Sequence, residues 1–519
     1  MTAQRRLGLF TLAVMLGLAW WSWRSVHNAG DSGRGGGVPE GATEGAAAPL
    51  DLPKPLAVHT QARAPIQPDP TNRLADDANA VALGERLFFD ESFSASGTVS
   101  CATCHDPQRA FTDGVPVAQG EGLGGRNTPT VLGAARRRWF TWDGRADTIW
   151  SQAAAPIEHP AEHGFDRTRL AVTIRDDPGV RRLWETAVGA LPKALDAVPV
   201  GLAARPAVAG ERLDAAPVAN WSALAPEQRA AINLVFSVSM KALGAFQRTL
   251  DMPLSSFDRW ADAVGRGRVS LDDPEAGGII TPAARRGWLL FSGKANCIQC
   301  HGGREFTDGE FHNLGLPGPD GRIGGDPGRR KAIAQLKSDP FSSAGEFSDD
   351  RDGAEARLVR SLKDDPETWG QFRTPSLRGV ALTAPYMHDG RFATLAEVIA
   401  FYDTLEGALA LDHHREAVLQ PLGLSSEERA DLEAFLHALT PETIPGAPEP
   451  AGTLEGSPEE PPRVHDPVGA PASSPERSPQ SSPQVHDSAR SSRRVVSEFP
   501  DPGYLLRTFD PSTKENRCA

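Results

Sequence analysis

The pattern of apolar and polar positions along the chain predicts helices and little strand. Leu83 and Leu87 are four positions apart with Phe88 beside them, as on the buried face of an amphipathic helix. Near the other end, the stretch LSSEERADLEAFLHAL begins with a Ser cap, a common start of a helix. The apolar residues on one face of that stretch are Leu432, Phe435, Leu436 and Leu439. We therefore predict an all-α fold.

A further helix is predicted to begin near Leu395. Thr394 and Glu397 have the spacing of a capping box, in which each side chain bonds to the backbone of the other residue. One face of the helix would then carry Leu395, Val398, Ile399 and Tyr402. Because this face is the apolar one, Tyr402 is expected to point inward, where a phenol needs a polar partner.

Composition separates a central body from the two ends of the 519-residue chain. Two arginines precede an uncharged, mostly apolar run over residues 7–23, so residues 1–28 are expected to be a signal peptide or a membrane anchor. A Gly-, Ala- and Pro-rich stretch predicts a flexible linker over residues 29–73. Residues 441–519 are Pro- and Ser-rich and are expected to be disordered. The formal net charge of −13 argues against nucleic acid as a partner.

Four of the five cysteines form two CxxCH motifs. The first is CATCH, with Cys101, Cys104 and His105, and the second is CIQCH, with Cys297, Cys300 and His301. This motif attaches a c-type haem, whose iron takes the histidine as ligand. A zinc site would need the two pairs close together in sequence, and a redox CxxC would not explain a histidine after both. We therefore predict two covalently bound haem c groups.

The sequence around the two motifs also repeats. ALGERLFFD precedes the first motif and RRGWLLFSG the second, while AFTDG and EFTDG follow them. This repetition predicts two all-α haem domains in tandem, over residues 74–265 and 266–440, which the resemblance described next implies are cytochrome c-like.

Together with CATCH, the stretches RNTPTV, TWDGRA and FRTPSLRGVALTAPYMHDGRFATL give a chain that resembles the bacterial di-haem cytochrome c peroxidases. This family includes the methylamine-utilisation di-haem enzyme (MauG). The resemblance implies two helical haem domains with a calcium ion between them. Asn127 and the carbonyls of Thr383 and Pro385 would bind that calcium, and Trp142 would relay electrons between the haems.

The resemblance also implies that the haem held by His105 reacts with peroxide. Glu162 would act as acid and base, Gln152 would orient the peroxide, and Pro156 would lie nearby. A solvated surface glutamate is the alternative reading of Glu162, and the nearby Glu158, His159 and His163 are weaker candidates.

Two positions depart from parts of the family in an informative way. The family's well-known peroxidases carry a histidine after the first motif that blocks the iron until the second haem is reduced. Here no histidine lies between His105 and His159, so we expect the first haem to stay five-coordinate without activation. The residue fourteen positions after His388 is Tyr402, where the family places methionine or tyrosine as the second ligand of the C-terminal haem.

Tyr402 is accordingly the predicted second ligand beside His301, and His388 would lie near that haem without binding iron. Met387 as ligand and a plain core tyrosine at position 402 remain alternatives.

The predicted activity is reduction of hydrogen peroxide to water in the periplasm, with electrons from a small donor protein, a cytochrome c or a cupredoxin. The first alternative is a MauG-like oxidation of a partner protein's side chain through high-valent haem. In the methylamine-type enzyme a tryptophan two residues before the second motif carries the electron holes, and this chain has Ala295 there. The second alternative is a di-haem electron carrier without enzymatic activity.

Overall fold

The computed structural model describes residues 54–59, 63–208, 214–318, 325–409, 416 and 418–445. The predicted signal or anchor over residues 1–28 lies outside these residues. So do the first part of the predicted linker and nearly all of the predicted disordered tail.

The described residues are mostly helical, in agreement with the prediction. The α-helices of the first half are α2 (Lys54–Ala57), α3 (Ala78–Phe89), α4 (Cys101–Cys104), α5 (Ile149–Gln152), α6 (Ala154–Glu158), α7 (Arg167–Asp176), α8 (Pro178–Val188), α9 (Ala215–Ala223) and α10 (Pro226–Thr249). Those that follow are α11 (Ser256–Gly265), α12 (Pro282–Ser292), α13 (Arg329–Ser338), α14 (Ala354–Ser361), α15 (Leu395–Thr404) and α16 (Ser426–Ala438). The short 3-10 helices are η1 (Glu91–Phe93), η2 (Pro107–Arg109), η3 (Ala134–Arg136), η4 (Lys193–Ala197), η5 (Ala276–Gly278), η6 (Cys297–Gln299), η7 (Pro366–Thr368) and η8 (Val380–Leu382).

Strand structure in the described ranges is limited to one small antiparallel pair. Strand β1 (Phe311–His312) pairs with β2 (Phe372–Arg373), with Phe311 opposite Arg373. Besides this pair, only isolated bridges are found in those ranges. The residues that follow β2 lie beside the loop that follows the second haem motif, where the Thr307 hydroxyl donates to the carbonyl of Thr374.

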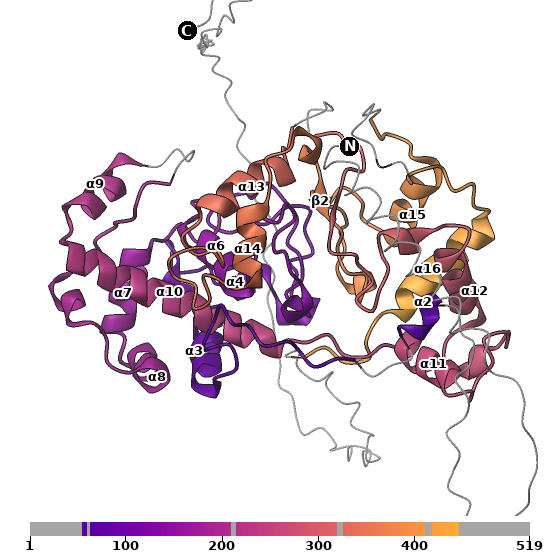
Figure 1. The fold of residues 1–519 in the computed structure, drawn as a ribbon, viewed down its shortest axis with the longest axis horizontal. Coiled ribbons are helices and arrows are strands. Elements are labelled where there is room, and N and C mark those ends of the chain that lie inside the picture. The colour runs from indigo at the N-terminus through magenta and orange to yellow at the C-terminus, as the bar shows by residue number, and fades with distance from the viewer. Residues whose placement is uncertain are drawn as a thin grey trace, which may run out of the picture. The chain divides into compact units, whose positions relative to one another are not determined.

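The described residues form two large apolar cores. The first is built mainly from residues between 74 and 252, on α3, α5 to α8 and α10. The second takes its residues from α2, α11, α12, α15 and α16. Figure 1 shows α11, α12 and α16 gathered around α2, and α3, α7 and α8 near α10. Each core contains one CxxCH motif at its edge, with Cys101 packed on the first core and Cys297 on the second.

Each core is organised by a close crossing of two helices at a glycine. A Cβ atom added to Gly84 on α3 would lie 1.9 Å from the carbonyl oxygen of Ala242 on α10. A Cβ atom added to Gly287 on α12 would lie 1.9 Å from the carbonyl oxygen of Asp431 on α16. Both glycines come from the repeated segments that precede the two motifs, so the sequence repeat corresponds to a repeated helix crossing.

The helices predicted from periodicity are confirmed. In α3, Leu83, Leu87 and Phe88 are buried. Helix α16 is capped by Ser425, and α15 begins at Leu395 with the Thr394–Glu397 capping box in place. All four residues predicted for the apolar face of the last helix are buried, namely Leu432, Phe435, Leu436 and Leu439.

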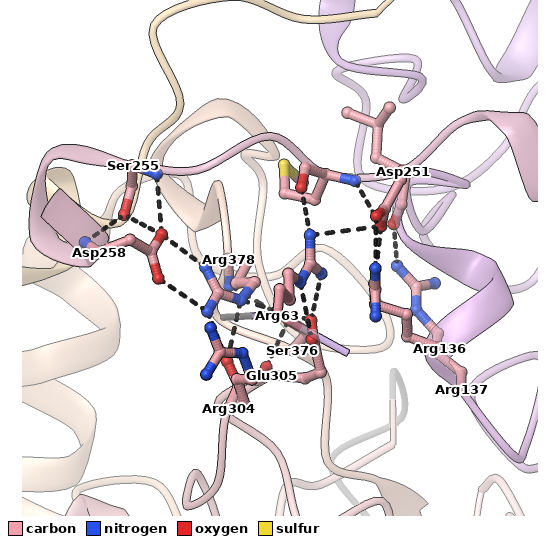
Figure 2. Close-up of polar contacts among 12 residues, drawn as sticks. Arg63, Arg136, Arg137, Asp251, Ser255, Asp258, Arg304, Glu305, Ser376 and Arg378 are labelled. Atoms are coloured by element: carbon pink, nitrogen blue, oxygen red, sulfur yellow. Dashed lines mark hydrogen bonds and ion pairs between the residues drawn. The ribbon is translucent and has the colours of Figure 1, made fainter. Parts of the chain in front are cut away.

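The structure differs from the sequence prediction over the end of the proposed flexible linker. Helix α2 places Leu56 and His59 in the second core, where they are 0% and 3% exposed. Arg63 then forms ion pairs with Glu305 at 2.6 Å and Asp251 at 3.3 Å (Figure 2). Further on, the Asn72 side chain donates to the carbonyl of Lys241 on α10. Local composition indicated a linker, but contacts with residues distant in sequence fix these residues in place.

Candidate active site

The first CxxCH motif is formed by a single helical turn. Helix α4 spans Cys101–Cys104 and begins with a capping box between Ser100 and Thr103. Nδ1 of His105 lies 3.1 Å from the carbonyl oxygen of Phe111. Because a carbonyl can only accept, Nδ1 carries the proton and Nε2 keeps its lone pair for a metal.

The second motif has the same geometry. Nδ1 of His301 lies 3.2 Å from the carbonyl oxygen of Phe306, so its Nε2 is also available as a ligand. Cys297 and Cys300, like Cys101 and Cys104, form no disulfide and are partly exposed. Two thiols and a histidine with a free Nε2, repeated on two cores, fit the attachment of one haem c at each motif.

Glu162 lies near the first motif, since its backbone carbonyl is bonded to the loop whose Gln119 carbonyl is 3.7 Å from the Cys104 sulfur. It follows α6 in a loop, is 35% exposed, and its Oε1 lies 3.5 Å from Nδ1 of His159. Burial is the main cause of the raised pKa of the Cys101 and Cys104 thiols, to about 12 and about 11, and the Glu162 charge contributes to both. The carboxylate is therefore within electrostatic reach of the two cysteine sulfur atoms. A group that acts on a molecule bound at this motif would need such proximity.

The neighbouring carboxylate, Glu158, is occupied elsewhere. It is buried and forms hydrogen bonds of 2.9 and 2.7 Å with the guanidinium of Arg167. Burial by itself would raise the pKa of Glu158, but the charge and hydrogen bonds of Arg167 lower it overall. Glu158 is thus held as a structural ion pair, which distinguishes it from Glu162.

The two weaker histidine candidates differ in their surroundings. His163 is buried, with Nδ1 3.1 Å from the Phe93 carbonyl and Nε2 3.8 Å from the Cys101 sulfur. It forms part of the wall beside the thioether position. His159 is exposed and contacts Glu162.

Helices α5 and α6 position the other two predicted residues of the peroxide site. Gln152 is the last residue of α5 and is half-buried. Pro156 lies in α6 and is also half-buried, and its carbonyl accepts hydrogen bonds from the backbone of His159 and His163. The loop that carries Glu162 is thus folded back onto the helix that contains Pro156.

The loop over residues 114–126, where the sequence lacks the expected histidine, is fastened against the Glu162 loop. The backbone nitrogen of Glu121 donates to the carbonyl of Glu162, and that of Gly122 donates to the carbonyl of Ala161. The Glu121 side chain accepts hydrogen bonds of 2.7 and 2.6 Å from Ser96. These contacts hold the loop beside the first motif without any imidazole in it.

A chain of hydrogen bonds through Trp142 joins the segments that follow the two motifs. The Trp142 indole donates to the carbonyl of Asn127 at 2.8 Å, and its own carbonyl accepts from the backbone nitrogen of Arg373 at 2.8 Å. The backbone nitrogen of Asn127 in turn donates to the carbonyl of His388. Trp142 therefore connects the RNTP segment with strand β2.

His388 stacks on the ring of Phe372, with centroids 3.8 Å apart. Burial lowers its pKa to about 4, so the imidazole is neutral at pH 7. It is partly exposed, and its backbone carbonyl accepts a hydrogen bond from Asn127.

Tyr402 and the nearby Tyr386 differ in the charges that act on their phenols. Burial raises the pKa of the Tyr402 phenol, and the charges of Cys297 and Cys300 add to the shift. Tyr386 has its pKa raised to about 12 by burial, with Glu433 as the contributing charge. Met387 has a positive φ of 72° in the turn before His388. Of the two tyrosines, Tyr402 is the one whose phenol is influenced by the second motif.

The residues predicted to bind calcium lie on two segments that meet. Asn127 is buried, and its Nδ2 donates to the carbonyl of Val115, which leaves Oδ1 for a cation. The bond from Asn127 to the His388 carbonyl brings it against the segment that begins with Thr383 and Pro385. An amide oxygen and backbone carbonyls are donors that calcium accepts.

The sequence analysis missed a charged group beside the second motif. Asp308 and His312 form an ion pair of 2.9 Å, and both lie close to Cys300. A haem thioether would use the Cys300 sulfur, so this group is an electrostatic neighbour of the second haem rather than a separate metal site. Asp308 belongs to the repeated EFTDG stretch. The pairing of Asp308 with His312 depends on the fold and could not be predicted from that repeat.

Two CxxCH motifs, each at the edge of its own helical core, define a di-haem c-type cytochrome. A family model for di-haem cytochrome c peroxidases matches residues 78–265. The methylamine utilization protein MauG of Methylorubrum extorquens is 33% identical over 377 residues, which are 71% of this chain and 81% of that protein. The chain therefore belongs to the di-haem cytochrome c peroxidase family.

Other relatives carry peroxidase names. Cytochrome-c peroxidase IdrP1 of Denitromonas iodatirespirans is 30% identical over 374 residues, covering 70% of this chain and 82% of that protein. The diheme peroxidase BthA of Burkholderia thailandensis has a similar fold, with a TM-score of 0.51, 22% identity, and coverage of 73% of this chain and 92% of that one. This chain is accordingly an oxidoreductase of the cytochrome c peroxidase type with two haem c groups, and the electron-carrier reading is set aside.

Proposed function

We propose that the protein reduces hydrogen peroxide to water at the haem attached to Cys101 and Cys104. Each peroxide takes up two electrons and two protons and gives two molecules of water. The haem iron supplies the electron exchange with peroxide when the group is bound. The proposal rests mainly on the Glu162 carboxylate, whose charge acts on the cysteines of the first motif, and on the loop over residues 114–126, which contains no histidine.

In this scheme Glu162 moves a proton between the two peroxide oxygens. Such a group must lie near the reacting atoms and must be able to exchange protons with water. Its partial exposure meets the second need, and the effect of its charge on Cys101 and Cys104 supports the first. Gln152 would hydrogen-bond the peroxide, and Pro156 would limit the space beside it.

Electrons would enter through the second haem and reach the first past Trp142. The hydrogen bonds of Trp142 to the Asn127 carbonyl and from the Arg373 backbone support this role, since they join segments next to the two motifs. The donor would be a small periplasmic cytochrome c or cupredoxin. Residues 74–265 and 266–440 would form the two haem domains, which is supported by the separate cores.

We propose Tyr402 as the second ligand of the iron held by His301. An anionic oxygen donor favours the ferric state, whereas methionine raises the potential. The location of its phenol near Cys297 and Cys300 supports this assignment. A calcium ion held by Asn127 and the carbonyls of Thr383 and Pro385 would stabilise the junction between the two domains.

A second candidate activity is oxidation of a side chain on a partner protein. It is favoured by the relatives named methylamine utilization protein. Ala295, at the position where the methylamine-type enzyme has tryptophan, is buried and 4% exposed. Since alanine cannot carry a radical, that exit is not preserved, and we keep peroxide reduction as the principal proposal.

Rapid mixing of the purified di-ferric protein with peroxide tests the proposal. We expect the haem absorption bands to change within the mixing period, and Glu162→Gln to slow this change by about 10²- to 10⁴-fold, the usual contribution of acid–base catalysis. Glu121→Gln is the matched control, because its carboxylate is bound to Ser96, and should react at the normal rate.

A Glu162→Gln protein that reacts as fast as the native one would refute the assigned role. Steady oxidation of a reduced small cytochrome by peroxide would then distinguish a peroxidase from an enzyme that modifies a partner protein. A protein that consumes peroxide only when a partner is oxidised would favour the second candidate.

A further inference from the structure

Two arginines near the centre of the described fold carry positive charges without a carboxylate partner. Arg373 is 5% exposed, and its guanidinium bonds only to the carbonyls of Thr141 and Thr374. Arg137 donates to the carbonyls of Thr130 and Leu132, at 2.9 and 2.7 Å. Carbonyls satisfy the N–H groups but do not neutralise the charge, and an uncompensated buried charge is costly.

Two neighbouring arginines, by contrast, are paired with carboxylates (Figure 2). Arg136 forms bonds of 2.8 and 2.6 Å with Asp251, although it is adjacent to Arg137 in sequence. Arg378 is bound by both oxygens of Asp258. Arg137 and Arg373 lack such a bonded carboxylate among the described residues. The buried Arg329 also bonds to carbonyls, those of Asp143 and Gly144, but the charge of the Asp143 carboxylate acts on it.

Burial lowers the pKa of both exceptions, to about 10 for Arg137 and about 9 for Arg373, and the Arg137 charge adds to the shift of Arg373. The two cations are thus within electrostatic reach of each other. Arg137 is partly exposed, and the Glu305 charge that acts on it is already shared with Arg63 and Arg378. Among the described residues no carboxylate bonds to either Arg137 or Arg373, so the two cations can accept a further anion.

Each of the two arginines is attached to the loop behind one of the haem-binding histidines. Arg137 donates to the Thr130 carbonyl, and the Thr130 hydroxyl donates to the carbonyl of Ala110 at 2.6 Å, next to the Phe111 carbonyl that holds His105.

On the other side, Arg373 donates to the Thr374 carbonyl, which also accepts from the Thr307 hydroxyl at 2.7 Å. Thr307 follows Phe306, whose carbonyl holds His301. Between them, the Trp142 carbonyl accepts from the backbone nitrogen of Arg373.

We propose that Arg137 and Arg373 form a carboxylate-binding pair that takes propionate groups of the two covalently attached haems. Arg137 would serve the haem held by His105, and Arg373 the haem held by His301. The propionates would supply the missing negative charge, and the arginines would bind and orient each haem with respect to Trp142. The inference rests on haem occupancy of both motifs and does not depend on the peroxidase reaction.

The test is the midpoint potential of each haem, measured by spectroelectrochemical titration of holoprotein variants without peroxide. Removing a cation near a haem disfavours the added electron, so Arg137→Gln should lower the potential of the first haem and Arg373→Gln that of the second. We expect about a tenfold lower ferrous-to-ferric ratio at a fixed potential, which is 59 mV for a one-electron couple. This is the size of effect of one unit charge about 10 Å from the iron at an effective dielectric constant of about 20.

Arg136→Gln is the matched control, because that arginine is bonded to Asp251 and the Ala64 carbonyl rather than to a loop behind a haem-binding histidine, and it should shift neither potential by a comparable amount. Arg373→Lys keeps the charge and should restore most of the potential. Equal shifts in Arg136→Gln and Arg137→Gln would overturn the proposal.

An experimental structure of the native holoprotein gives a second test that needs no variant. Propionate oxygens within hydrogen-bond distance of the two guanidiniums would support the pair. Propionates directed elsewhere, or an inorganic anion bound between the two arginines, would contradict it.

Discussion

The glycine crossings offer a test of how each core is held together. In Gly84→Ala the new Cβ would lie 1.9 Å from the carbonyl oxygen of Ala242, 2.5 Å from its carbon and 3.0 Å from the nitrogen of Leu243. All three atoms are backbone, so no side chain can move away. Helices α3 and α10 would have to separate by roughly 1.5 Å to reach an ordinary contact distance.

We expect this substitution to reduce the free energy of unfolding by about 3 kcal/mol, at the upper end of the range for overpacked cores. That corresponds to a roughly hundredfold change in the unfolding equilibrium. The assay is denaturant unfolding of the holoprotein followed by circular dichroism. Gly287→Ala should cost about as much, since its Cβ would meet the Asp431 carbonyl at the same 1.9 Å.

Gly125→Ala serves as the control, because a Cβ added there meets nothing within 4 Å. Its stability should change by no more than about 0.5 kcal/mol, as for an ordinary surface substitution. If Gly84→Ala were as stable as the control, the reasoning from the helix crossing would be refuted.

Three further substitutions test other parts of the account. Tyr402→Met should raise the midpoint potential of the second haem, because a thioether favours ferrous iron more than a phenolate does; an unchanged potential in a redox titration would exclude Tyr402 as ligand. Asn127→Ala should lower the calcium content per chain measured by elemental analysis, and an unaltered content would remove Asn127 from the calcium site. Asp258→Asn should destabilise the protein by about 3 kcal/mol at pH 7, the lower end of the range for breaking a buried ion pair, because Arg378 would keep only the more distant Glu305, at 3.3 Å. Burial would raise the pKa of Asp258, but the hydrogen bonds and charge of Arg378 lower it overall. A lowered carboxyl pKa contributes stability that is complete above the unfolded value of about 3.9 and is lost as pH falls through the folded value. The difference between native and variant in denaturant unfolding should therefore shrink from pH 7 to pH 3, and a difference independent of pH would contradict the ion-pair explanation.

Local features of the sequence predicted a large part of this structure. The capping box at Thr394 fixed the start of α15, and the periodicity that placed Tyr402 inward depends only on residues within two turns. The two CxxCH motifs could likewise be identified alone, because the spacing of their ligands is set by one turn of backbone.

Features that depend on distant partners could not be predicted in this way. Gly84 stands out in the repeat, but the helix that it approaches begins more than a hundred residues later. The pairing of Arg63 with Glu305 joins residues 242 positions apart. The sequence alone therefore could not predict that the end of the apparent linker is ordered. Arg136 and Arg137 are adjacent, and nothing in the local sequence distinguishes them. Only the fold shows that Arg136 binds a carboxylate, whereas Arg137 binds backbone carbonyls.

The most direct test of the proposed activity is the electron paramagnetic resonance spectrum of the oxidised holoprotein. An open position on the iron held by His105 predicts one high-spin and one low-spin ferric signal, without any prior reduction. Two low-spin signals would show that a protein side chain occupies that position, and would contradict the proposed peroxide site beside Glu162.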